Sequence, residues 1–318
     1  MSKYHQLTQE ERYRITAHRM AGSSQADIAR LLQRHPSTIG RELRRNATAH
    51  DGDYRAEKAH SYATARRRRC RRGARFSAEQ MARVSALVRQ KWSAEQISGT
   101  LKKSGELRIS VETIYRRIRW DKKIGGSLWR HTRIMSKFGR KRYGRQDSRG
   151  VLPGKRHISE RPSEVEQRRR IGHWEGDTVM GSDMRHCVLT LVERKSGYAI
   201  IKKLKARTKD EVTRAATRAI RSHCRKFKTI TFDNGTEFHN YALLEERFPI
   251  KVYFATPYHS WERGSNENFN GLLRQYLPKG TCMRSLTQAQ CDQIVDDLNN
   301  RPRKRLGFNT PADLYHRH

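Results

Sequence analysis

Two stretches of the first 120 residues repeat the same order of helix-start signals and inward-facing apolar positions. A serine that can cap a helix is followed by apolar residues four and eight positions later: Ser24, Ile28 and Leu32, and again 69 residues on, Ser93, Ile97 and Leu101. A threonine and two apolar residues also recur, at an offset of 75: Thr38, Ile39 and Leu43, and then Thr113, Ile114 and Ile118. This spacing predicts two small units of short helices. The alternative is chance similarity between amphipathic helices.

The first stretch has the pattern of a helix-turn-helix. Thr8 and Glu11 predict a capping box for a first helix that ends near Gly22. Pro36 is suited to the first position of a third helix, because its missing N–H needs no partner there. The outward side chains of that helix are hydroxyls and arginines, which can meet phosphates and base edges in the major groove. We predict DNA contacts from Ser37, Thr38, Arg41, Arg44 and Arg45. The alternative is a three-helix packing unit with a solvated arginine face.

The second stretch predicts a similar reader. Ser77 with Gln80 caps its first helix, and the connection before its third helix is six residues longer than in the first stretch. We expect its third helix to present Thr113, Arg116, Arg117 and Arg119 outward. Two readers on one chain favour a long or bipartite DNA site over a single operator half-site.

The charge of the chain indicates a polyanionic partner. Lysine and arginine number 68 against 32 acidic residues, which gives a formal net charge of +36. Residues 1–150 carry +24 of this charge and residues 151–318 carry +12. Basic side chains that neutralise phosphates gain affinity by releasing counterions. A basic surface kept for solubility, or a ribosome-like RNA coat, is the alternative, but the uneven distribution favours a partner surface in the first half.

These patterns divide the chain into five segments. We predict a first helix-turn-helix DNA-binding domain over 1–65 and a second over 77–120. The arginine run within 66–76 and the Gly-, Arg- and Lys-rich stretch within 121–170 are interpreted as basic linkers that can lie along phosphates. The remaining residues, 171–318, are predicted to form a further domain, whose function the later motifs indicate.

From Ile171 the pattern changes to alternating and continuous apolar runs. HWEGDTVMG predicts a strand, and HCVLTLVERKSGYAIIKKL predicts two strands joined by a turn. A helix is expected from Thr208 to Lys226, then strands in TITFDNG and KVYFATPY, and a late helix from Ser265 to Tyr276. A strand meander followed by alternating helices and strands indicates a mixed α/β sheet. The fold class is therefore multidomain, with all-α helix-turn-helix domains before an α/β domain.

Three acids fall at the ends of these predicted elements. Asp177 lies on the first strand, Asp233 ends the fourth strand, and Glu267 opens the late helix. Carboxylates from separate elements can converge, and hard divalent cations prefer such oxygen ligands. Two ions about 3.5 to 4 Å apart can activate an attacking oxygen and stabilise a leaving oxygen on phosphorus. Spacing alone does not select this triple, because Glu175, Glu237 and Glu262 lie close by in the sequence.

Longer motifs resemble a known family. GHWEGDTV, TFDNGTEF, WERGSNENFNGLLRQYLPKG and NNRPRKRLGFNTP resemble the catalytic core of transposases of the insertion sequence thirty family, which has the DDE class of active site on an RNase H-like fold. ERYRITAHRMAGSSQADIARLLQRHPSTIGRELRRN, WSAEQISGTLK and ISVETIYRRI resemble its DNA-binding segments. The resemblance implies that Asp177, Asp233 and Glu267 are the catalytic metal ligands. It also implies that Arg274, seven residues after the glutamate, holds a DNA phosphate, although a surface salt bridge is the alternative.

The resemblance further implies a DNA transposase that acts on double-stranded DNA. It would bind the terminal inverted repeats of its own element, cut there with water as nucleophile, and transfer the strand to target DNA. The expected cofactor is Mg²⁺, as two ions for which Mn²⁺ can substitute. The expected assembly is a homo-oligomer, at least a dimer on paired ends.

Residues near the three acids have plainer interpretations. We expect Trp174 to be core rather than a stacking platform for bases, and His173 to be a hydrogen-bonded structural residue. Asn266 could cap the late helix or contact a distorted DNA end. The stretch RPRKR, residues 301–305, is most simply another phosphate contact.

Other features bound the location and the alternatives. The apolar runs are too short to cross a membrane, no leader precedes them, and the five cysteines form no CxxC pair. We expect a cytoplasmic, nucleoid-associated bacterial protein without a membrane partner, a zinc site or disulfides. Two rival functions remain. One is a helix-turn-helix regulator with a non-catalytic RNase H-like assembly domain, and the other is a nuclease acting on hybrid or structured nucleic acid.

Overall fold

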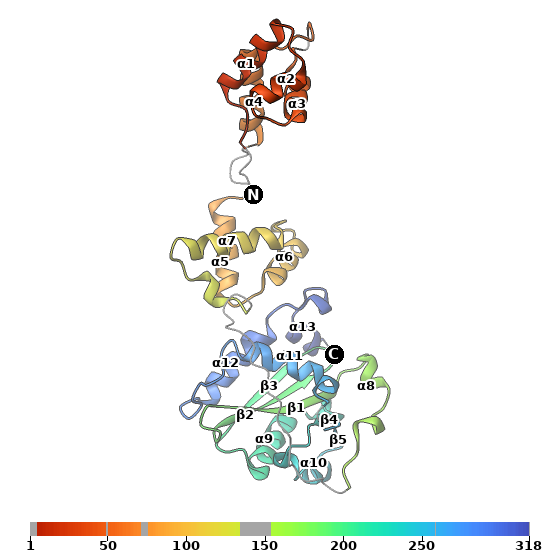
Figure 1. The fold of residues 1–318 in the computed structure, drawn as a ribbon. Helices are drawn as coiled ribbons and strands as arrows, with labels where there is room; N and C mark the ends of the chain where they lie inside the picture. The colour runs from red at the N-terminus through yellow and green to blue at the C-terminus, as the bar shows by residue number, and fades with distance from the viewer. Residues whose placement is uncertain (1–4, 49, 71–75, 134–153, 258, 318) are drawn as a thin grey trace. The chain divides into compact units, whose positions relative to one another are not determined.

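The computed structural model describes residues 5–48, 50–70, 76–133, 154–257 and 259–317, and its chain divides into two compact units, Met1–Ser77 and Ala78–His318 (Figure 1). Parts of the two predicted linkers, 71–75 and 134–153, lie outside the described residues. No helix in the described ranges is long and apolar enough to cross a membrane.

The first unit holds four helices: α1 (Gln9–Met20), α2 (Gln25–Leu31), α3 (Pro36–Asn46) and α4 (Ala56–Cys70). The predicted capping box of Thr8 and Glu11 is present, and Pro36 begins α3 as expected. Ile28 and Ile39 are fully buried in its small core. The helix-turn-helix prediction is confirmed for this unit by its helices and by the family comparison given below.

Helix α4 was not predicted from the sequence, which indicated a basic linker from residue 66. The residues AEKAHSYATARRRRC form one continuous helix, with Ala59 buried against the core. Small alanines and a run of arginines give little helical hydrophobic pattern, since only Ala-sized positions face inward. Arg66 donates a hydrogen bond to the carbonyl oxygen of Arg45, so the arginine run begins beside α3.

The second compact unit begins with a similar set of helices: α5 (Ala78–Arg89), α6 (Ala94–Lys103) and α7 (Val111–Lys123). Ser93 and Gln96 form the predicted capping box of α6, and Ile97, Ile114 and Ile118 are buried as expected. These helices also touch the domain that follows. Gln96 Nε2 donates to the carbonyl oxygen of Pro302 at 2.8 Å.

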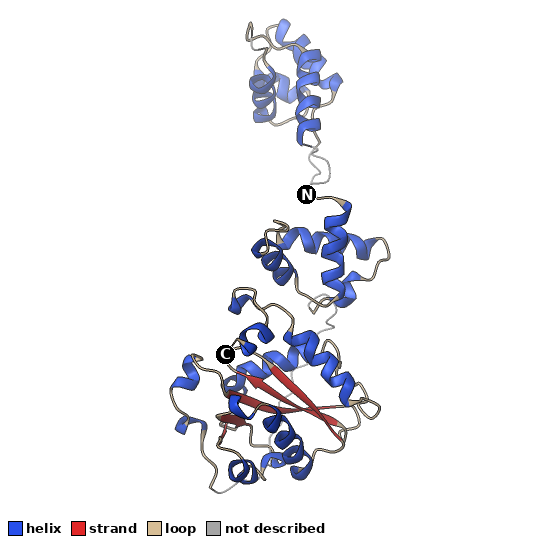
Figure 2. Cartoon of the chain, turned by 180° about the vertical axis from the view of Figure 1, so that it is seen from behind, coloured by secondary structure: helices blue, strands red, loops and turns tan. Residues whose placement is uncertain are grey.

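A five-stranded sheet follows, in the order β3-β2-β1-β4-β5 (Figure 2). Its strands are β1 (His173–Met180), β2 (Cys187–Glu193), β3 (Ala199–Leu204), β4 (Thr229–Phe232) and β5 (Lys251–Phe254). The first three strands pair antiparallel, whereas β1, β4 and β5 pair parallel. The predicted mixed sheet is confirmed, strand by strand.

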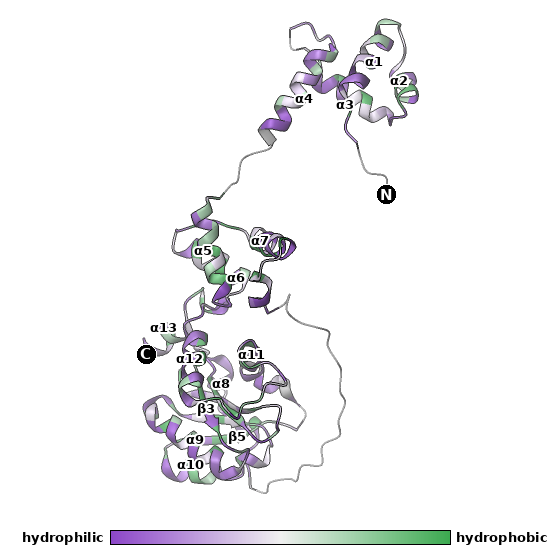
Figure 3. Cartoon of the chain, turned by 90° about the vertical axis from the view of Figure 1, so that its left-hand side faces the viewer, coloured by the Kyte–Doolittle hydropathy of each residue, from purple (hydrophilic) through white to green (hydrophobic). Residues whose placement is uncertain are grey.

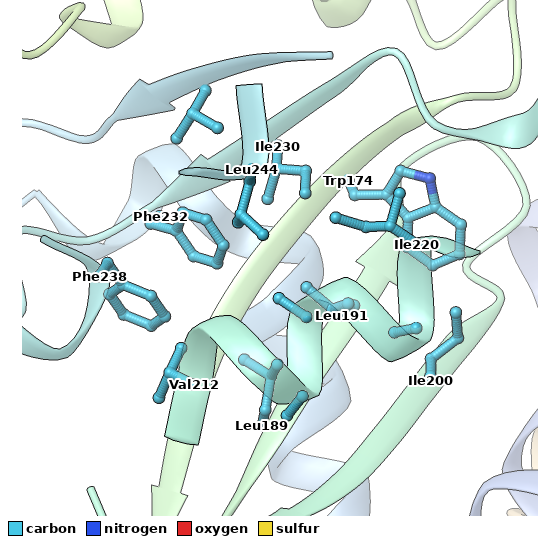
Figure 4. Close-up of a cluster of buried hydrophobic side chains, with 14 of the residues drawn as sticks. Trp174, Leu189, Leu191, Ile200, Val212, Ile220, Ile230, Phe232, Phe238 and Leu244 are labelled. Atoms are coloured by element: carbon cyan, nitrogen blue, oxygen red, sulfur yellow. The ribbon is translucent and has the colours of Figure 1, made fainter. Parts of the chain in front are cut away.

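Helices cover both faces of this sheet. Helix α9 (Lys209–Ser222) packs on one face over a core that contains Trp174, Leu191 and Phe232 (Figure 4). Helices α11 (Gly264–Leu273) and α12 (Gln288–Asn299) pack on the other face over a second core. The buried hydrophobic side chains therefore form one core on each face of the sheet, and Figure 3 colours the ribbon by the hydropathy of each residue.

Shorter elements complete the domain. The remaining α-helices are α8 (Glu164–Gln167), α10 (Ala242–Arg247) and α13 (Pro311–His316). The described residues also form six 3-10 helices: η1 (Leu128–His131), η2 (Ile158–Glu160), η3 (Cys224–Lys226), η4 (Thr236–Phe238), η5 (Ser260–Arg263) and η6 (Lys304–Leu306).

A close approach of a phenylalanine ring explains why β1 has a glycine, Gly176, between two acidic residues. A Cβ at this position would lie 2.2 Å from the ring of Phe232, which is itself buried and stacked on Phe238. We expect Gly176→Ala to lower the free energy of unfolding by about 1 to 3 kcal/mol through overpacking. Urea denaturation measures it. Gly264→Ala is the matched control, because a Cβ there meets nothing within 4 Å, and equal stability of the two variants would contradict this packing.

Candidate active site

The sheet register brings the two predicted aspartates to neighbouring positions. Strands β1 and β4 run parallel with Glu175 opposite Thr231. Continued by two residues, the same register sets Asp177 opposite Asp233, which follows directly after β4. Side chains two residues apart on a strand share one face, so Glu175 and Asp177 both point toward the layer that contains α11.

Arg263 lies between the two carboxylates. Its Nη1 atom is 3.8 Å from an Asp177 oxygen and its Nη2 atom is 3.5 Å from an Asp233 oxygen. The guanidinium also donates to the carbonyl oxygen of Gly176 at 3.0 Å. The side chains of Asp177 and Asp233 are 25% and 26% exposed, so both carboxylates remain open to solvent at this point. The two acids thus face one shared cation position.

Hydrogen bonds hold the Asp177 carboxylate in one orientation, and burial disfavours its negative charge. Asn270 Nδ2 donates to its Oδ2 atom at 2.8 Å, and its Oδ1 atom accepts from the backbone N–H of Thr178. Burial raises the pKa of Asp177 to about 6, with the charge of Arg263 opposing this rise and the charge of Asp233 adding to it. A carboxylate placed at such a cost has a strong preference for a nearby cation.

Glu267 lies on α11, exposed to solvent. It makes no hydrogen bond or ion pair with any residue that the structure describes. Within the same described ranges, no three acidic, histidine or cysteine side chains gather closely enough to hold a metal ion. The structure therefore brings Asp177 and Asp233 together and leaves Glu267 apart from them. Glu267 shares a helical face with Asn270, three residues later, and Arg263, four residues earlier.

Arg274 is placed differently from the sequence-based expectation. Helix α11 ends at Leu273, earlier than predicted, so Arg274 is the residue that ends the helix. Its guanidinium donates to the carbonyl oxygens of Met180 and Leu277, at 3.2 and 3.3 Å, and burial lowers its pKa. The side chain is half-buried and bound to backbone, and it forms no ion pair with an acid among the described residues, so the surface salt bridge considered from the sequence is not present there.

The other acids near the site are bound to protein groups. Glu175 is wholly buried and pairs with Arg194. Glu237 is buried and pairs with Arg207, while Glu262 accepts hydrogen bonds from Thr256. Asp177 and Asp233 differ from all three, because the cation between them is shared and partly open to solvent.

The plainer expectations can be compared with the structure. Trp174 is core, fully buried and stacked on Phe227 with ring centroids 4.2 Å apart. His173 is buried and hydrogen-bonded to Thr229. The suggestion that Asn266 caps the helix is wrong, because α11 begins at Gly264 and Asn266 lies buried within its first turn.

The residues at this site fit a divalent metal. Asp177 and Asp233 supply hard carboxylate oxygens of the kind that Mg²⁺ and Mn²⁺ take as ligands. Their oxygens already surround a positive group from both sides, which shows that the space between them accepts a cation. Sequence reasoning missed Arg263 and Asn270, although their spacing around Glu267 on one helical face was a signal for both.

The first unit carries a candidate DNA-reading surface on α3. Ser37, Arg41, Arg44 and Arg45 are exposed, and Thr38 is half-buried. A groove of about 410 Å³ beside this helix is lined by Arg41 and Arg45 together with Arg66 and Arg67 from α4. The unpredicted helix thus adds two arginines to the basic surface that the sequence indicated.

The second helical set carries a smaller surface on α7. Arg116 is exposed, as expected. Arg117 is half-buried and its guanidinium lies 4.7 Å from the ring centroid of Trp120. The hydroxyl of Thr113 is hydrogen-bonded to that of Ser110 at the start of the helix, and the side chain is half-buried. Of the outward residues predicted on α7, Arg116 and Arg119 are therefore the exposed ones, and Arg119 pairs with Glu112.

The chain is similar to known proteins over nearly its whole length. The chain is 38% identical over 315 residues to the transposase for insertion sequence element IS4351 of Bacteroides fragilis, covering 99% of this chain and 96% of that protein. It is 37% identical to the transposase InsI for insertion sequence element IS30A of Escherichia coli, covering 98% and 83%. The chain belongs to the insertion sequence thirty (IS30) family of transposases.

Two domain families match this transposase. The family described as a helix-turn-helix domain matches residues 3–46, and the one described as an integrase core domain matches residues 167–260. The integrase core domain is a divalent-metal-dependent nuclease and strand-transferase fold, RNase H-like in architecture. Among solved structures, the catalytic core domain of BIV integrase is 20% identical, covers 46% of this chain and 95% of its own, and has a TM-score of 0.37.

Proposed function

We propose that this transposase binds the terminal inverted repeats of its own insertion sequence, cuts the DNA there, and joins the cut strand to target DNA. Asp177, Asp233 and Glu267 would hold two Mg²⁺ ions, for which Mn²⁺ can substitute. The observation that carries the proposal is the pair of aspartates on neighbouring strands of an integrase core, Asp177 within β1 and Asp233 directly after β4, which share one cation position.

The three acids and Asn270 each have a distinct role in the proposed reaction. Bound metal supplies activation of the attacking oxygen and neutralisation of charge on the leaving oxygen. Asp177 and Asp233 would hold it from the sheet, and Glu267 from α11. Asn270 keeps the Asp177 carboxylate oriented through its amide. Phosphoryl transfer needs little beyond such positioning and charge neutralisation.

The DNA would be held by basic surfaces on both compact units. We assign end binding to α3, with Ser37, Thr38, Arg41, Arg44 and Arg45, and further contacts to α7, with Thr113, Arg116 and Arg117. Arg274 could reach a phosphate only after leaving its backbone acceptors. Pairing of two element ends calls for a homo-oligomer, at least a dimer, and the place of action would be the bacterial nucleoid in the cytoplasm.

The test uses the DNA that flanks the open reading frame. Short imperfect inverted repeats there supply labelled oligonucleotide substrates. Purified protein should bind them and, with Mg²⁺ but not with EDTA, release a cut strand and join it to a second duplex. Binding without any cleavage or joining in Mg²⁺ or Mn²⁺ would favour the regulator with a non-catalytic assembly domain.

Arg45 provides a separate test of the end reader. We expect Arg45→Ala to weaken binding to end DNA by about 1 to 3 kcal/mol if it contacts a base, and to reduce the salt slope by about 1 if it contacts a phosphate. Fluorescence anisotropy over a salt series measures both. Arg19→Ala, which removes an exposed arginine from α1, is the control for loss of one charge. Equal affinities and slopes for the two variants would remove Arg45 from the reading surface.

A further inference from the structure

A groove of about 230 Å³ runs along one flank of α11 and has three arginines in its lining. Arg168 comes from the loop after α8, and Arg303 and Arg305 come from the segment after α12. Ser265 and Asn268 line it from α11 itself. We call it the arginine groove.

The three guanidiniums of the arginine groove bind only neutral acceptors among the described residues. Arg168 donates to the Ser265 hydroxyl at 3.2 Å, Arg303 to the carbonyl oxygen of Leu298 at 2.9 Å, and Arg305 to that of Lys195 at 2.8 Å. No carboxylate in the described ranges forms an ion pair with any of the three.

The nearest acids are already occupied. Glu193, whose charge acts on Arg305, is fully buried and accepts hydrogen bonds from Ser196. Glu166, close to Arg168, pairs with Arg161 and Arg194. Among the described residues no acid forms an ion pair with the arginine groove, and Glu193 and Glu166 act on Arg305 and Arg168 only from a distance.

The arginines of the groove stay charged although they lie close to one another. Burial and the charges of Arg301 and Arg305 lower the pKa of Arg303, and burial and Arg168 lower that of Arg305. Guanidinium groups stay protonated at neutral pH, so loss of a proton does not relieve the repulsion. Gly197, at φ +73°, makes room for Arg305, because a Cβ there would lie 2.5 Å from its Nη2 atom.

Arg301, two residues before Arg303 in the chain, corrects one sequence-based interpretation. It is 1% exposed and donates to Gln275 and to the hydroxyl of Tyr276. The interpretation of the whole RPRKR stretch as a phosphate contact is thus wrong for Arg301. Its Nε atom is buried without a hydrogen-bond partner in the described structure.

The arginine groove and the candidate active site flank the same helix. Ser265, Asn268 and Leu272 form the groove side of α11, whereas Arg263 and Asn270 contact Asp177 from the other side. A helix with its side chains is about 10 to 12 Å across. Duplex DNA carries a backbone charge about every 1.7 Å along its axis. A duplex that crosses α11 therefore brings phosphates to both flanks.

We propose that the arginine groove binds a backbone phosphate of the duplex DNA on which the catalytic site acts, on the flank of α11 opposite the aspartates. The inference rests on the proposed transposase function. The phosphate belongs either to the element end or to the target, and the two share one chemistry. Arginine forks match the geometry of phosphate oxygens, and an anion supplies the ion-pair partner that the three arginines lack among the described residues.

The test compares two double variants of the full-length protein. Arg168→Ala/Arg305→Ala removes two of the three arginines of the groove. Arg218→Ala/Arg221→Ala removes the same charge from exposed positions on α9, over the opposite face of the sheet. Thermal denaturation first checks that both variants fold, and Arg305→Lys serves as a milder groove variant if the double variant does not.

We expect the groove variant to bind duplex DNA with a salt slope lower by about 1 than the control, since one lost phosphate contact removes about 0.9. Slower cleavage of end DNA would identify the element end as the source of the phosphate, and slower joining alone would identify the target. Equal slopes for the groove variant and the control would overturn the proposal. The slope needs no metal or cleavage, so absence of cleavage by wild-type protein would count against the proposed function alone.

Discussion

Asp177→Asn and Glu267→Gln proteins are expected to bind element-end DNA as wild type does, but to cut and join it at least about 10³-fold more slowly. Each change keeps the shape of the side chain and removes one negative oxygen ligand. Asp177 already shares a cation position with Asp233, so its loss breaks the half of the site that the fold has assembled. Single-turnover cleavage of a labelled end oligonucleotide in Mg²⁺ measures the effect.

Glu246→Gln is the matched control for these variants. Glu246 is exposed on α10, which packs on the α9 side of the sheet, and its change removes the same charge. We expect it to cleave at the wild-type rate. If the Asp177→Asn protein and the Glu267→Gln protein each cleaved at the wild-type rate, the assignment of both carboxylates would be contradicted.

Glu175→Ala is expected to lower the free energy of unfolding by about 3 kcal/mol, because it leaves Arg194 without its fully buried partner. Glu175 also accepts a hydrogen bond from the backbone N–H of Asn266 at 2.9 Å, which fixes the first turn of α11 against β1. Arg194 retains Glu166, which keeps the loss at the lower end of the range for broken buried pairs. Urea denaturation, followed by far-UV circular dichroism, measures it.

A second variant of Glu175 and a control variant of an exposed acid separate the effect of charge from that of packing. Glu175→Gln keeps an acceptor for the Asn266 N–H and should lose less stability than Glu175→Ala. Glu246→Ala, at an exposed acid in α10, should change stability by no more than about 0.5 kcal/mol. A Glu175→Ala protein as stable as the Glu246→Ala protein would show that Glu175 does not support α11.

The helix starts could be predicted because their signals are local. Thr8 with Glu11, and Ser93 with Gln96, form their capping boxes within four residues of chain. Helix α4 lacked such signals, since its inward face is built from alanines and its end is a run of arginines. Its position depends on packing against α1 and α3, which a local pattern does not contain.

The site was predictable in part for a similar reason. Asp177 and Asp233 stand on or directly after strands, and parallel pairing of β1 and β4 then sets them opposite one another. The part of Arg263 depends on how η5 and α11 pack against the sheet, and this is a tertiary property. Helix α11 ends at Leu273, whereas the sequence-based expectation continued it to Tyr276, and Arg274 donates to backbone carbonyl oxygens instead.

The most direct test of the account exchanges the ligand chemistry at the two aspartates. In Mg²⁺, Asp177→Cys and Asp233→Cys proteins should be inactive, because a hard cation binds thiolate poorly. In Mn²⁺ or Cd²⁺, the cysteine variants should regain at least about tenfold in end cleavage over the matching alanine variants, because softer metals accept sulfur. Wild-type cleavage by either cysteine variant in Mg²⁺ would contradict the claim that these two carboxylates hold the catalytic metal.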